Sequence, residues 1–336
     1  MEGSKESKAI RMAIIGIVIS LLTIIVILKF TETKLTLSMV RRMNIWYVLL
    51  AVLFQVLFWL FWAIRLRMVV SYLGHSISMM YSLETTISSM FLAAITPSSA
   101  GGEPLRVKML KDDGMSVGAA AASVLTERIL DSIFFAVSLP VFIIISKFAV
   151  KFGFEVSSIF SVILVLFLLF IYFIVKDQKN IDRITKYIYK IIKSVSKSRA
   201  QNLTAHIRDE LIAFREALIK LVSSLKNAFN LLTITALMWT IGFLIPSAIL
   251  LAFNYDPCLL LSYTAQLIIV IVSLIPLTPG SSGIAEVSMA YLYSKFVPQE
   301  ILGPLVGLWR FITYFLNIIV GFAVNIKIFK RICVGV

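Results

Sequence analysis

The sequence has very little of the residues from which disulfide frameworks and metal sites are built. It contains two cysteines and two histidines in 336 residues. Cys258 and Cys333 are far apart and flanked by apolar residues, while His75 and His206 stand alone. Because no cluster with metal-ligand spacing is present, the sequence predicts no disulfide framework, no metal site and no cofactor. The phosphate-binding pattern Gly-x-x-x-x-Gly-Lys-[Ser/Thr] is also absent, so ATP hydrolysis by this chain is not expected.

Charged residues are also few, and the acidic ones are fewest. Charged side chains make up 15% of the chain, with 32 Lys and Arg against 18 Asp and Glu, a formal net charge of +14. Hydrophobic residues reach 59% and the mean hydropathy is +0.94, which excludes an ordinary soluble domain and is typical of an integral membrane protein. Since membrane proteins concentrate Lys and Arg in cytoplasmic loops, the basic excess indicates topology and contact with lipid headgroups rather than nucleic acid binding.

Six apolar segments have roughly the length needed to cross a bilayer. They lie near Met12–Leu28, Trp46–Ile64, Ala119–Ser146, Val156–Val175, Ala228–Phe253 and Leu305–Ile326. The first follows a polar, mildly basic start and is longer than a typical signal-peptide core, so we interpret it as a retained span, with a signal anchor as the alternative. We therefore expect an all-α polytopic membrane protein whose residues 1–336 form a single membrane domain.

Two stretches rich in Pro, Gly and Ser interrupt the apolar sequence. The first runs from Ile95 to Pro104 and the second from Leu277 to Glu286. Irregular backbone at bilayer depth is tolerated only where it is buried in protein or lines a watery cavity, so both are candidate sites. The flanking apolar pieces are too short to span, and we expect two re-entrant hairpins of half-helices. These pieces are Ser82–Thr96, Pro104–Gly114, Ser262–Pro276 and Ile284–Phe296.

The two interrupted stretches match at one constant offset along the sequence. Thr96, Pro97, Ser99 and Gly101 correspond to Thr278, Pro279, Ser281 and Gly283, and the same offset carries Arg128 onto Arg310. We therefore predict two related halves, residues 46–147 and 228–331, each with a broken hairpin followed by a helix that carries a buried arginine. If each hairpin enters and leaves on one side, the halves form an inverted-topology repeat, both termini are cytoplasmic, and Arg65 and Arg67 belong to the cytoplasmic basic flanks.

Residues 176–227 form the one long polar stretch, rich in Lys and Arg, with Ile and Leu recurring at helical spacing. Basic amphipathic helices of this type lie in the cytoplasmic interface and are attracted to anionic lipid. A solvated basic linker is an equally good interpretation. The tryptophans fall mostly near segment ends and are interpreted as interfacial anchors. They are Trp46, Trp59, Trp62, Trp239 and Trp309.

Ionisable side chains within spans are costly, so each is expected to have a partner or a task. Glu127, Arg128 and Asp131 form one polar stripe at helical spacing, and Glu103 and Arg106 follow the first interruption. In the functional interpretation the Arg128 guanidinium binds a phosphate headgroup while a carboxylate positions it or accepts a proton. An internal ion pair that orients two helices is the alternative.

The glycines and prolines of both interruptions favour a site for an anion. Paired glycines permit close approach, and Pro104 suits the first turn of a half-helix whose N–H groups attract phosphate. In the alternative interpretation, Glu103 is only a carboxylate that stabilises the start of a helix, and Arg310 is only a structural arginine. The candidate substrate-binding residues are Thr96, Pro97, Gly101, Gly102, Glu103, Arg106, Glu127, Arg128, Asp131, Pro279, Gly280, Gly283, Glu286, Arg310 and Tyr314.

At these residues the chain resembles the membrane region of the lysylphosphatidylglycerol synthase/flippase family, which includes archaeal relatives implicated in dolichol-linked sugar handling. The matching stretches are Pro97–Arg106, Glu127–Asp131, Pro279–Glu286 and Arg310, and the resemblance covers nearly the whole chain. It implies a lipid-moving region without the soluble aminoacyl-transferase domain of synthase relatives, so enzyme activity is not expected. Ser281 and Ser282 depart from the pattern, because glycine is more often expected there.

The leading hypothesis is a flippase or scramblase in the cell membrane that moves a phospholipid or a polyprenyl-phosphate-linked headgroup. Transport would be downhill or coupled to an ion, with Glu103, Glu127, Asp131 and Glu286 as candidate proton carriers. One alternative is an intramembrane transferase acting on a lipid-linked substrate, with Glu103 and Glu127 as acid and base. Another is a secondary transporter of a small anionic solute. The expected ligand partner is a lipid with an anionic headgroup. The expected protein partner is a second copy of the chain, in a homo-oligomer, or a separate synthase.

Overall fold

The computed structural model describes residues 22, 25, 43–96, 101–195, 200–275, 278 and 280–334. Every regular element in these residues is a helix. Five helical stretches are long and apolar enough to cross a membrane, by length and composition. The described part of the chain is therefore an all-helical, multi-pass membrane protein with five candidate spans, as its hydropathy predicts.

The five candidate spans coincide with five of the six predicted ones. They are α3 (Ile45–Tyr72), α6 (Val117–Ser146), α7 (Val150–Lys176), α10 with α11 (Leu225–Phe243 and Ile245–Ala252), and α14, η1 and α15 together (Gln299–Arg310, Phe311–Phe315 and Leu316–Val334). The sixth predicted span, Met12–Leu28, falls outside the described residues except for Leu22 and Ile25. Polar caps mark where several helices begin, since Asn44 caps α3 and Ser116 caps α6 through their side-chain oxygens.

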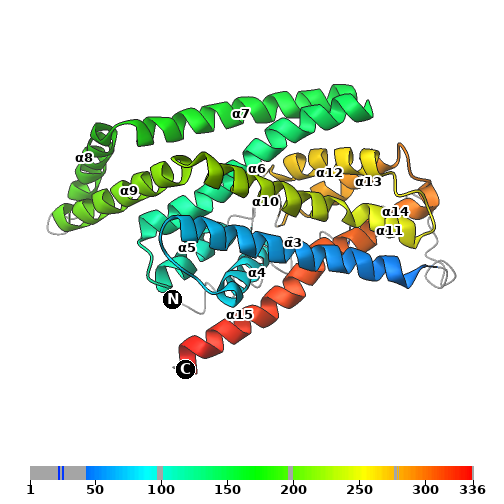
Figure 1. Cartoon of the computed structure of the whole chain (residues 1–336), viewed down its shortest axis with the longest axis horizontal. Helices are drawn as coiled ribbons and strands as arrows, with labels where there is room; N and C mark the ends of the chain where they lie inside the picture. Colours follow the sequence, from blue (N-terminus) through cyan, green and yellow to red (C-terminus); the bar gives the residue numbers. More distant parts are fainter. Residues whose placement is uncertain are drawn as a thin grey trace.

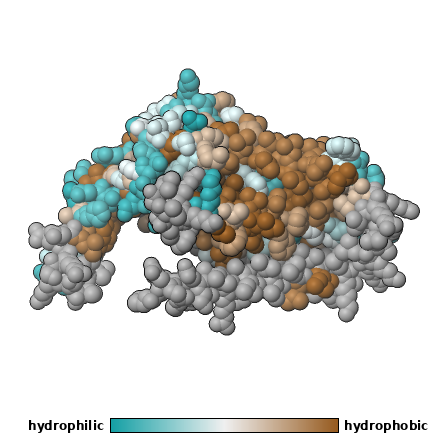
Figure 2. Space-filling model, turned by 90° about the horizontal axis from the view of Figure 1, so that it is seen from below, coloured by the Kyte–Doolittle hydropathy of each residue, from teal (hydrophilic) through white to brown (hydrophobic). Residues whose placement is uncertain are grey.

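The long helices run along one axis of the molecule. Figure 1 shows α8 at one end of this axis and α11 with α14 near the other, while α3, α6 and α7 extend between the two ends. Figure 2 shows hydrophobic residues over the middle of one face and hydrophilic residues gathered toward the end where α8 and α9 lie. Only 6% of the apolar window of α7 is buried, as expected for a helix that faces lipid.

Two pairs of short helices flank the interruptions, close to the predicted half-helices. The first pair is α4 (Met79–Ile95) and α5 (Gly102–Asp112), and the second is α12 (Leu259–Ser273) and α13 (Ile284–Tyr293). In the first pair Tyr81 Oη donates to Met109 O at 2.6 Å, so the start of α4 lies beside the end of α5. In the second pair Ser262 Oγ and Tyr293 Oη are 2.7 Å apart. Each pair is therefore antiparallel.

The two interruptions meet inside the molecule. Tyr314 Oη, on η1 of the second half, donates to Ala94 O at the end of α4 at 3.2 Å. A Cβ added to Gly280 would lie 2.7 Å from the same Ala94 oxygen. Pro97 and Pro279, both predicted site residues, lie outside the described residues. The described residues next to the two interruptions, Ala94 in the first half and Gly280 in the second, nevertheless lie side by side.

Residues 176–227 contain two helices, α8 (Gln178–Val195) and α9 (Ala200–Val222). Ile181 of α8 is fully buried, and Arg208 of α9 pairs with Asp182 of α8 at 2.9 Å. Helix α9 also packs closely on α6, where Gly118 N donates to Glu210 Oε2 at 2.6 Å. The apolar stripes of this stretch are thus used at least partly for helix packing.

The tryptophans correct the prediction of interfacial anchors. Trp46 is 75% exposed, whereas Trp59 and Trp309 are 6% exposed. Trp59 Nε1 donates to Asn317 Oδ1 at 2.8 Å, and Trp239 Nε1 donates to Asp131 Oδ1 at 2.8 Å. A buried indole N–H needs an acceptor, and these side chains find one inside the protein rather than at the membrane surface.

Candidate functional site

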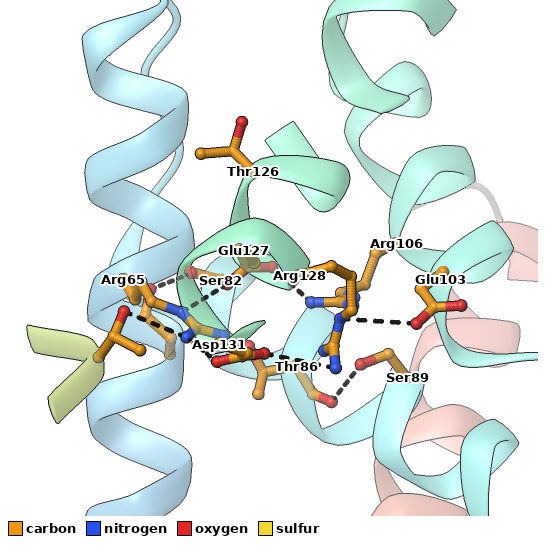
Figure 3. A network of polar contacts seen from close by, with 12 residues as sticks. Arg65, Ser82, Thr86, Ser89, Glu103, Arg106, Thr126, Glu127, Arg128 and Asp131 are labelled. Carbon is orange, nitrogen blue, oxygen red and sulfur yellow. Dashed lines mark hydrogen bonds and ion pairs between the residues drawn. The ribbon is translucent and has the colours of Figure 1, made fainter. Parts of the chain in front are cut away.

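A network of ion pairs connects α3, α5 and α6 (Figure 3). At its centre Arg65 Nε donates to Glu127 Oε1 at 3.2 Å, and Arg65 Nη1 donates to Asp131 Oδ1 at 2.5 Å. Arg65 and Glu127 are fully buried, and Asp131 is nearly so. Buried charges of this kind persist only when they are paired and hydrogen-bonded. Arg65 therefore holds the two carboxylates of α6 in place.

Arg106 of α5 completes the buried part of the network by donating through Nη1 to Glu127 Oε2. Arg106 lies one turn after the start of α5, and that start packs against α4. Gly102 permits that close approach, since a Cβ at this residue would lie 2.8 Å from Ser89 O. The paired glycines after the first interruption thus set the depth at which Arg106 lies.

Three guanidinium groups surround the ring of Trp62 on α3. The distances from guanidinium carbon to ring centroid are 5.8 Å for Arg65, 5.3 Å for Arg106 and 5.5 Å for Arg128. A tryptophan face attracts cations at such distances, so the ring offsets part of the repulsion among the arginines. Trp62 therefore belongs to the site, although its position in the sequence predicts only an interfacial anchor.

Arg128 is the most accessible arginine of the ion-pair network. Its side chain is 35% exposed, and it lies 3.5 Å from Glu103 Oε1 and 3.4 Å from Asp131 Oδ2. Glu103 is 43% exposed. Both distances exceed those of normal charge-assisted hydrogen bonds, so these contacts are weak compared with the pairs of Arg65. Arg128 and Glu103 are the charged groups of the network most able to exchange partners.

The second half carries a similar pair. Arg310 Nε donates to Glu286 Oε1 at 2.9 Å, and Arg310 Nη2 donates to Gly280 O at 2.9 Å. Glu286 also accepts from Gly283 N at 2.7 Å, which anchors the carboxylate at the start of α13. In each half, therefore, the arginine on the long helix pairs with the carboxylate that follows its own interruption.

A π-helical turn, η1, follows Arg310 directly. It places the Tyr314 ring under the guanidinium, with 3.9 Å between the Arg310 guanidinium carbon and the ring centroid. Single π-helical turns inside α-helices occur frequently at functional sites. Arg310 and Tyr314, both candidate site residues, are therefore in direct contact.

The backbone of the second interruption needs residues that tolerate positive φ. Gly280 has φ +55° and Gly283 has φ +88°. Ser281 also lies in the left-handed region, at φ 54°, and its Oγ donates to Ser273 O at 2.5 Å. Glycine tolerates this left-handed conformation best, and at Ser281 the serine hydroxyl supplies a compensating hydrogen bond.

One cavity of about 310 Å³ joins the two halves. The predicted site residues that line it are Gly102, Glu103, Arg106, Arg128, Gly280, Arg310 and Tyr314. Glu127, Asp131 and Glu286 lie behind these, buried against the arginines. Thr96, Gly101 and Gly283 shape the two turns, with Gly101 N donating to Thr96 Oγ1 at 2.9 Å. Arg128 and Arg310 therefore face one common space.

Arg65 is the principal residue of the network that is missing from the candidate site residues predicted from the sequence. It was predicted in a cytoplasmic flank because the apolar run ends near Ile64, but α3 continues to Tyr72. Arg65 is fully buried within this helix, where Glu127 and Asp131 neutralise its charge. The sequence does contain one indication of such a partner: α6 carries two carboxylates, Glu127 and Asp131, but only one arginine, Arg128, so a second cation is needed to balance them.

Comparisons with known proteins place the chain among membrane proteins of one family. Residues 13–321 match the family described as lysylphosphatidylglycerol synthase TM region. A UPF0104 membrane protein of Archaeoglobus fulgidus is 50% identical over 318 residues, covering 94% of this chain and 97% of that protein. A UPF0104 membrane protein of Methanothermobacter thermautotrophicus is 28% identical over 264 residues, covering 76% of this chain and 77% of that protein.

Proposed function

The chain belongs to the lysylphosphatidylglycerol synthase TM region family, and we propose that it moves a phospholipid or polyprenyl-phosphate-linked lipid between leaflets as a flippase or scramblase. The observation that carries this proposal is the cavity lined by Arg106, Arg128 and Arg310 from both halves. Guanidinium groups bind phosphate through paired hydrogen bonds, so this cavity suits a phosphate headgroup.

The starts of α5 and α13 add to the attraction for an anion. Gly102 and Ala285, in the first turns of these helices, both line the cavity. The N-terminal end of a helix carries a partial positive charge and unpaired N–H groups. A phosphate in the cavity would therefore meet two helix dipoles of favourable sign as well as the guanidinium groups.

Charge balance identifies Glu103 as the group that a headgroup would displace. Arg65, Arg106, Arg128 and Arg310 are matched by Glu103, Glu127, Asp131 and Glu286. Three of these carboxylates are nine-tenths or more buried in tight pairs, whereas Glu103 is accessible and 3.5 Å from Arg128. Exchange of Glu103 for the lipid phosphate, with or without proton uptake by Glu103, is the proposed binding step.

Translocation would use two re-entrant hairpins arranged as an inverted repeat. Antiparallel α4/α5 and α12/α13 pairs whose interruptions meet at Ala94 and Gly280 support this arrangement. The matched pairs Arg128–Glu103 and Arg310–Glu286 support it independently. Secondary transporters of this architecture alternate access by moving one repeat against the other around a central site.

The proposal also includes the membrane, the orientation and the partners of the protein. We place the protein in the cell membrane with both termini cytoplasmic, acting on a lipid with an anionic headgroup and not as an enzyme. A homo-oligomer or a separate synthase is the proposed protein partner. An intramembrane transferase would instead release a modified lipid, which product formation from a labelled lipid by the purified protein would reveal.

A leaflet-exposure assay in proteoliposomes tests the proposal. A fluorescent phosphatidylglycerol is the probe, and its loss from the outer leaflet is followed over time. Removal of one charge-assisted hydrogen bond costs about 1.5–3 kcal/mol, so Arg128→Gln is expected to slow translocation about tenfold or more. Arg67→Gln is the matched control, because Arg67 lies on α3 and is exposed. Translocation unchanged in both Arg128→Gln and Arg310→Gln would refute the phosphate-binding role.

A further inference from the structure

A second cavity of about 140 Å³ adjoins the arginine-lined one. Five residues line both cavities, so the two spaces are neighbours: Met90, Val270, Trp309, Thr313 and Asn317. The second cavity, which we call the amide chamber, is further lined by Gln55 of α3 and Gln266 of α12. Among the described residues that line it, none carries a charge.

The amides of this chamber are buried and incompletely used. Gln55 and Gln266 are each 3% exposed, and Asn317 is 8% exposed. Gln55 Nε2 donates to Asn317 Oδ1 at 3.2 Å, and Gln266 Nε2 donates to Tyr293 Oη at 3.0 Å. Within the described part of the chain these are the only side-chain hydrogen bonds of the two glutamines. Each glutamine therefore keeps a carbonyl oxygen and a second amide hydrogen for another partner.

Buried amides in a membrane protein serve either to join helices or to bind something polar. One hydrogen bond on each glutamine satisfies the joining role, since Gln55 links α3 to α15 and Gln266 links α12 to α13. The unused donors and acceptors of the two glutamines belong to two different helices, α3 and α12, and both side chains line the same cavity. Uncharged groups that both donate and accept are complementary to hydroxyls, which also do both. A carboxylate, which an ammonium group would need, is absent from the described lining.

We infer that the amide chamber binds the hydroxylated, uncharged end of a lipid headgroup, such as a glycerol or a sugar, while the arginine-lined cavity holds its phosphate. This inference rests on the proposed function and adds a substrate class to it. Trp239 connects the chamber to the ion-pair network, because it lines the chamber and its Nε1 donates to Asp131. A phosphate ester whose alcohol carries hydroxyls would span both.

The test compares two lipids whose headgroups differ in two hydroxyls and one carbon atom. Short-chain phosphatidylglycerol and phosphatidylethanol carry the same phosphodiester charge, but the ethanol ester lacks free hydroxyls. Each is titrated into purified full-length protein in detergent, with tryptophan fluorescence as the signal, because Trp239 and Trp309 line the chamber. One neutral hydrogen bond corresponds to roughly a two- to tenfold change in affinity. We expect wild-type protein to bind phosphatidylglycerol at least about threefold more tightly than phosphatidylethanol.

Substitutions separate this inference from the proposed function. Gln55→Met and Gln266→Met keep side-chain length and are expected to bring the affinity ratio close to one, with phosphatidylethanol affinity little changed. Arg128→Gln is expected to weaken the binding of both lipids by the same factor. Equal wild-type affinities, or a ratio unchanged in both methionine variants, would overturn the chamber assignment and leave the phosphate site standing. Binding of neither lipid would overturn both proposals, and tighter binding of short-chain phosphatidylcholine would assign the chamber to a cationic headgroup instead.

Discussion

At the scale of single residues, the arginines of the network differ in what surrounds them. Arg65 is fully buried, and its Nε and Nη1 donate to Glu127 and Asp131. Arg128 is one-third exposed and makes only long contacts with its carboxylates. A buried pair is costly to break because the remaining charge stays desolvated, whereas an accessible pair can be replaced by water or ligand. Arg65 therefore stabilises the structure, and Arg128 is the arginine available to the proposed ligand.

Removal of Arg65 should destabilise the protein strongly. Arg65→Met leaves Glu127 and Asp131 with one fewer counter-charge inside the membrane domain, and the loss of one partner of a buried pair costs about 3–5 kcal/mol. Chemical unfolding in detergent measures the difference. Arg67→Met is the control, since this exposed arginine two residues later should change stability by less than about 0.5 kcal/mol. Equal stability of the two variants would contradict the structural role of Arg65.

At the scale of helices, closeness between α6 and α9 depends on a single glycine. A Cβ added to Gly118 would lie 2.0 Å from Glu210 O and 2.8 Å from Phe214 N, both backbone atoms. No rotation of a side chain can relieve such contacts, so the two helix axes must move apart. This glycine fixes how α9, and α8 with it, dock on the membrane domain.

Gly118→Ala should therefore loosen α8 and α9 while leaving the rest of the fold intact. Overpacking of a tight contact costs typically about 1–3 kcal/mol, and here the cost falls on helix docking. Limited proteolysis should cut α8 and α9 faster in the variant than in wild-type protein. Val137→Ile is the control, because it adds one methyl group to α6 at a residue that is 62% exposed. Equal cleavage rates in the three proteins would refute the close packing.

The helices also show which parts of the structure a sequence can predict. The half-helices were predicted within a few residues because proline, glycine and capping residues act locally, as at Ser78 before α4. The predicted Arg128–Asp131 contact follows from helical spacing alone and is confirmed. The partners of Arg65 are 62 and 66 residues away, and Asn317 contacts Gln55 across 262 residues. Such pairings depend on how helices pack, which no local pattern specifies.

At the scale of the whole molecule, two ends can be told apart by their chemistry. The end with α8 carries many exposed lysines and tyrosines, whereas the turn between α11 and α12 has Asp256 and Cys258. The positive-inside rule predicts that the basic end is cytoplasmic and that the turn lies at the outer surface. The native cysteine in that turn gives a direct probe of this orientation.

Cys258 and a cysteine on α8 should be labelled from opposite sides of the membrane. One protein keeps Cys258 and carries Cys333→Ser; the other carries Cys258→Ser, Cys333→Ser and Tyr187→Cys, at a side chain that is 67% exposed. A membrane-impermeant maleimide applied to intact cells should label only the first protein. Labelling of both, or of the Tyr187→Cys protein alone, would contradict the orientation and with it the predicted side of each hairpin.

The pH dependence of labelling checks that the reaction occurs at Cys258 in its folded surroundings. Burial, together with the hydrogen bond and negative charge of Asp256, raises the pKa of the Cys258 thiol to about 11. Because a raised pKa leaves less thiolate at a given pH, the labelling rate should be low at pH 7 and rise about tenfold per pH unit toward pH 10. Asp256→Asn removes the negative charge that opposes ionisation, so labelling at pH 8 should become faster. A rate that levels off near pH 9 in the wild-type turn would contradict the raised pKa of the Cys258 thiol.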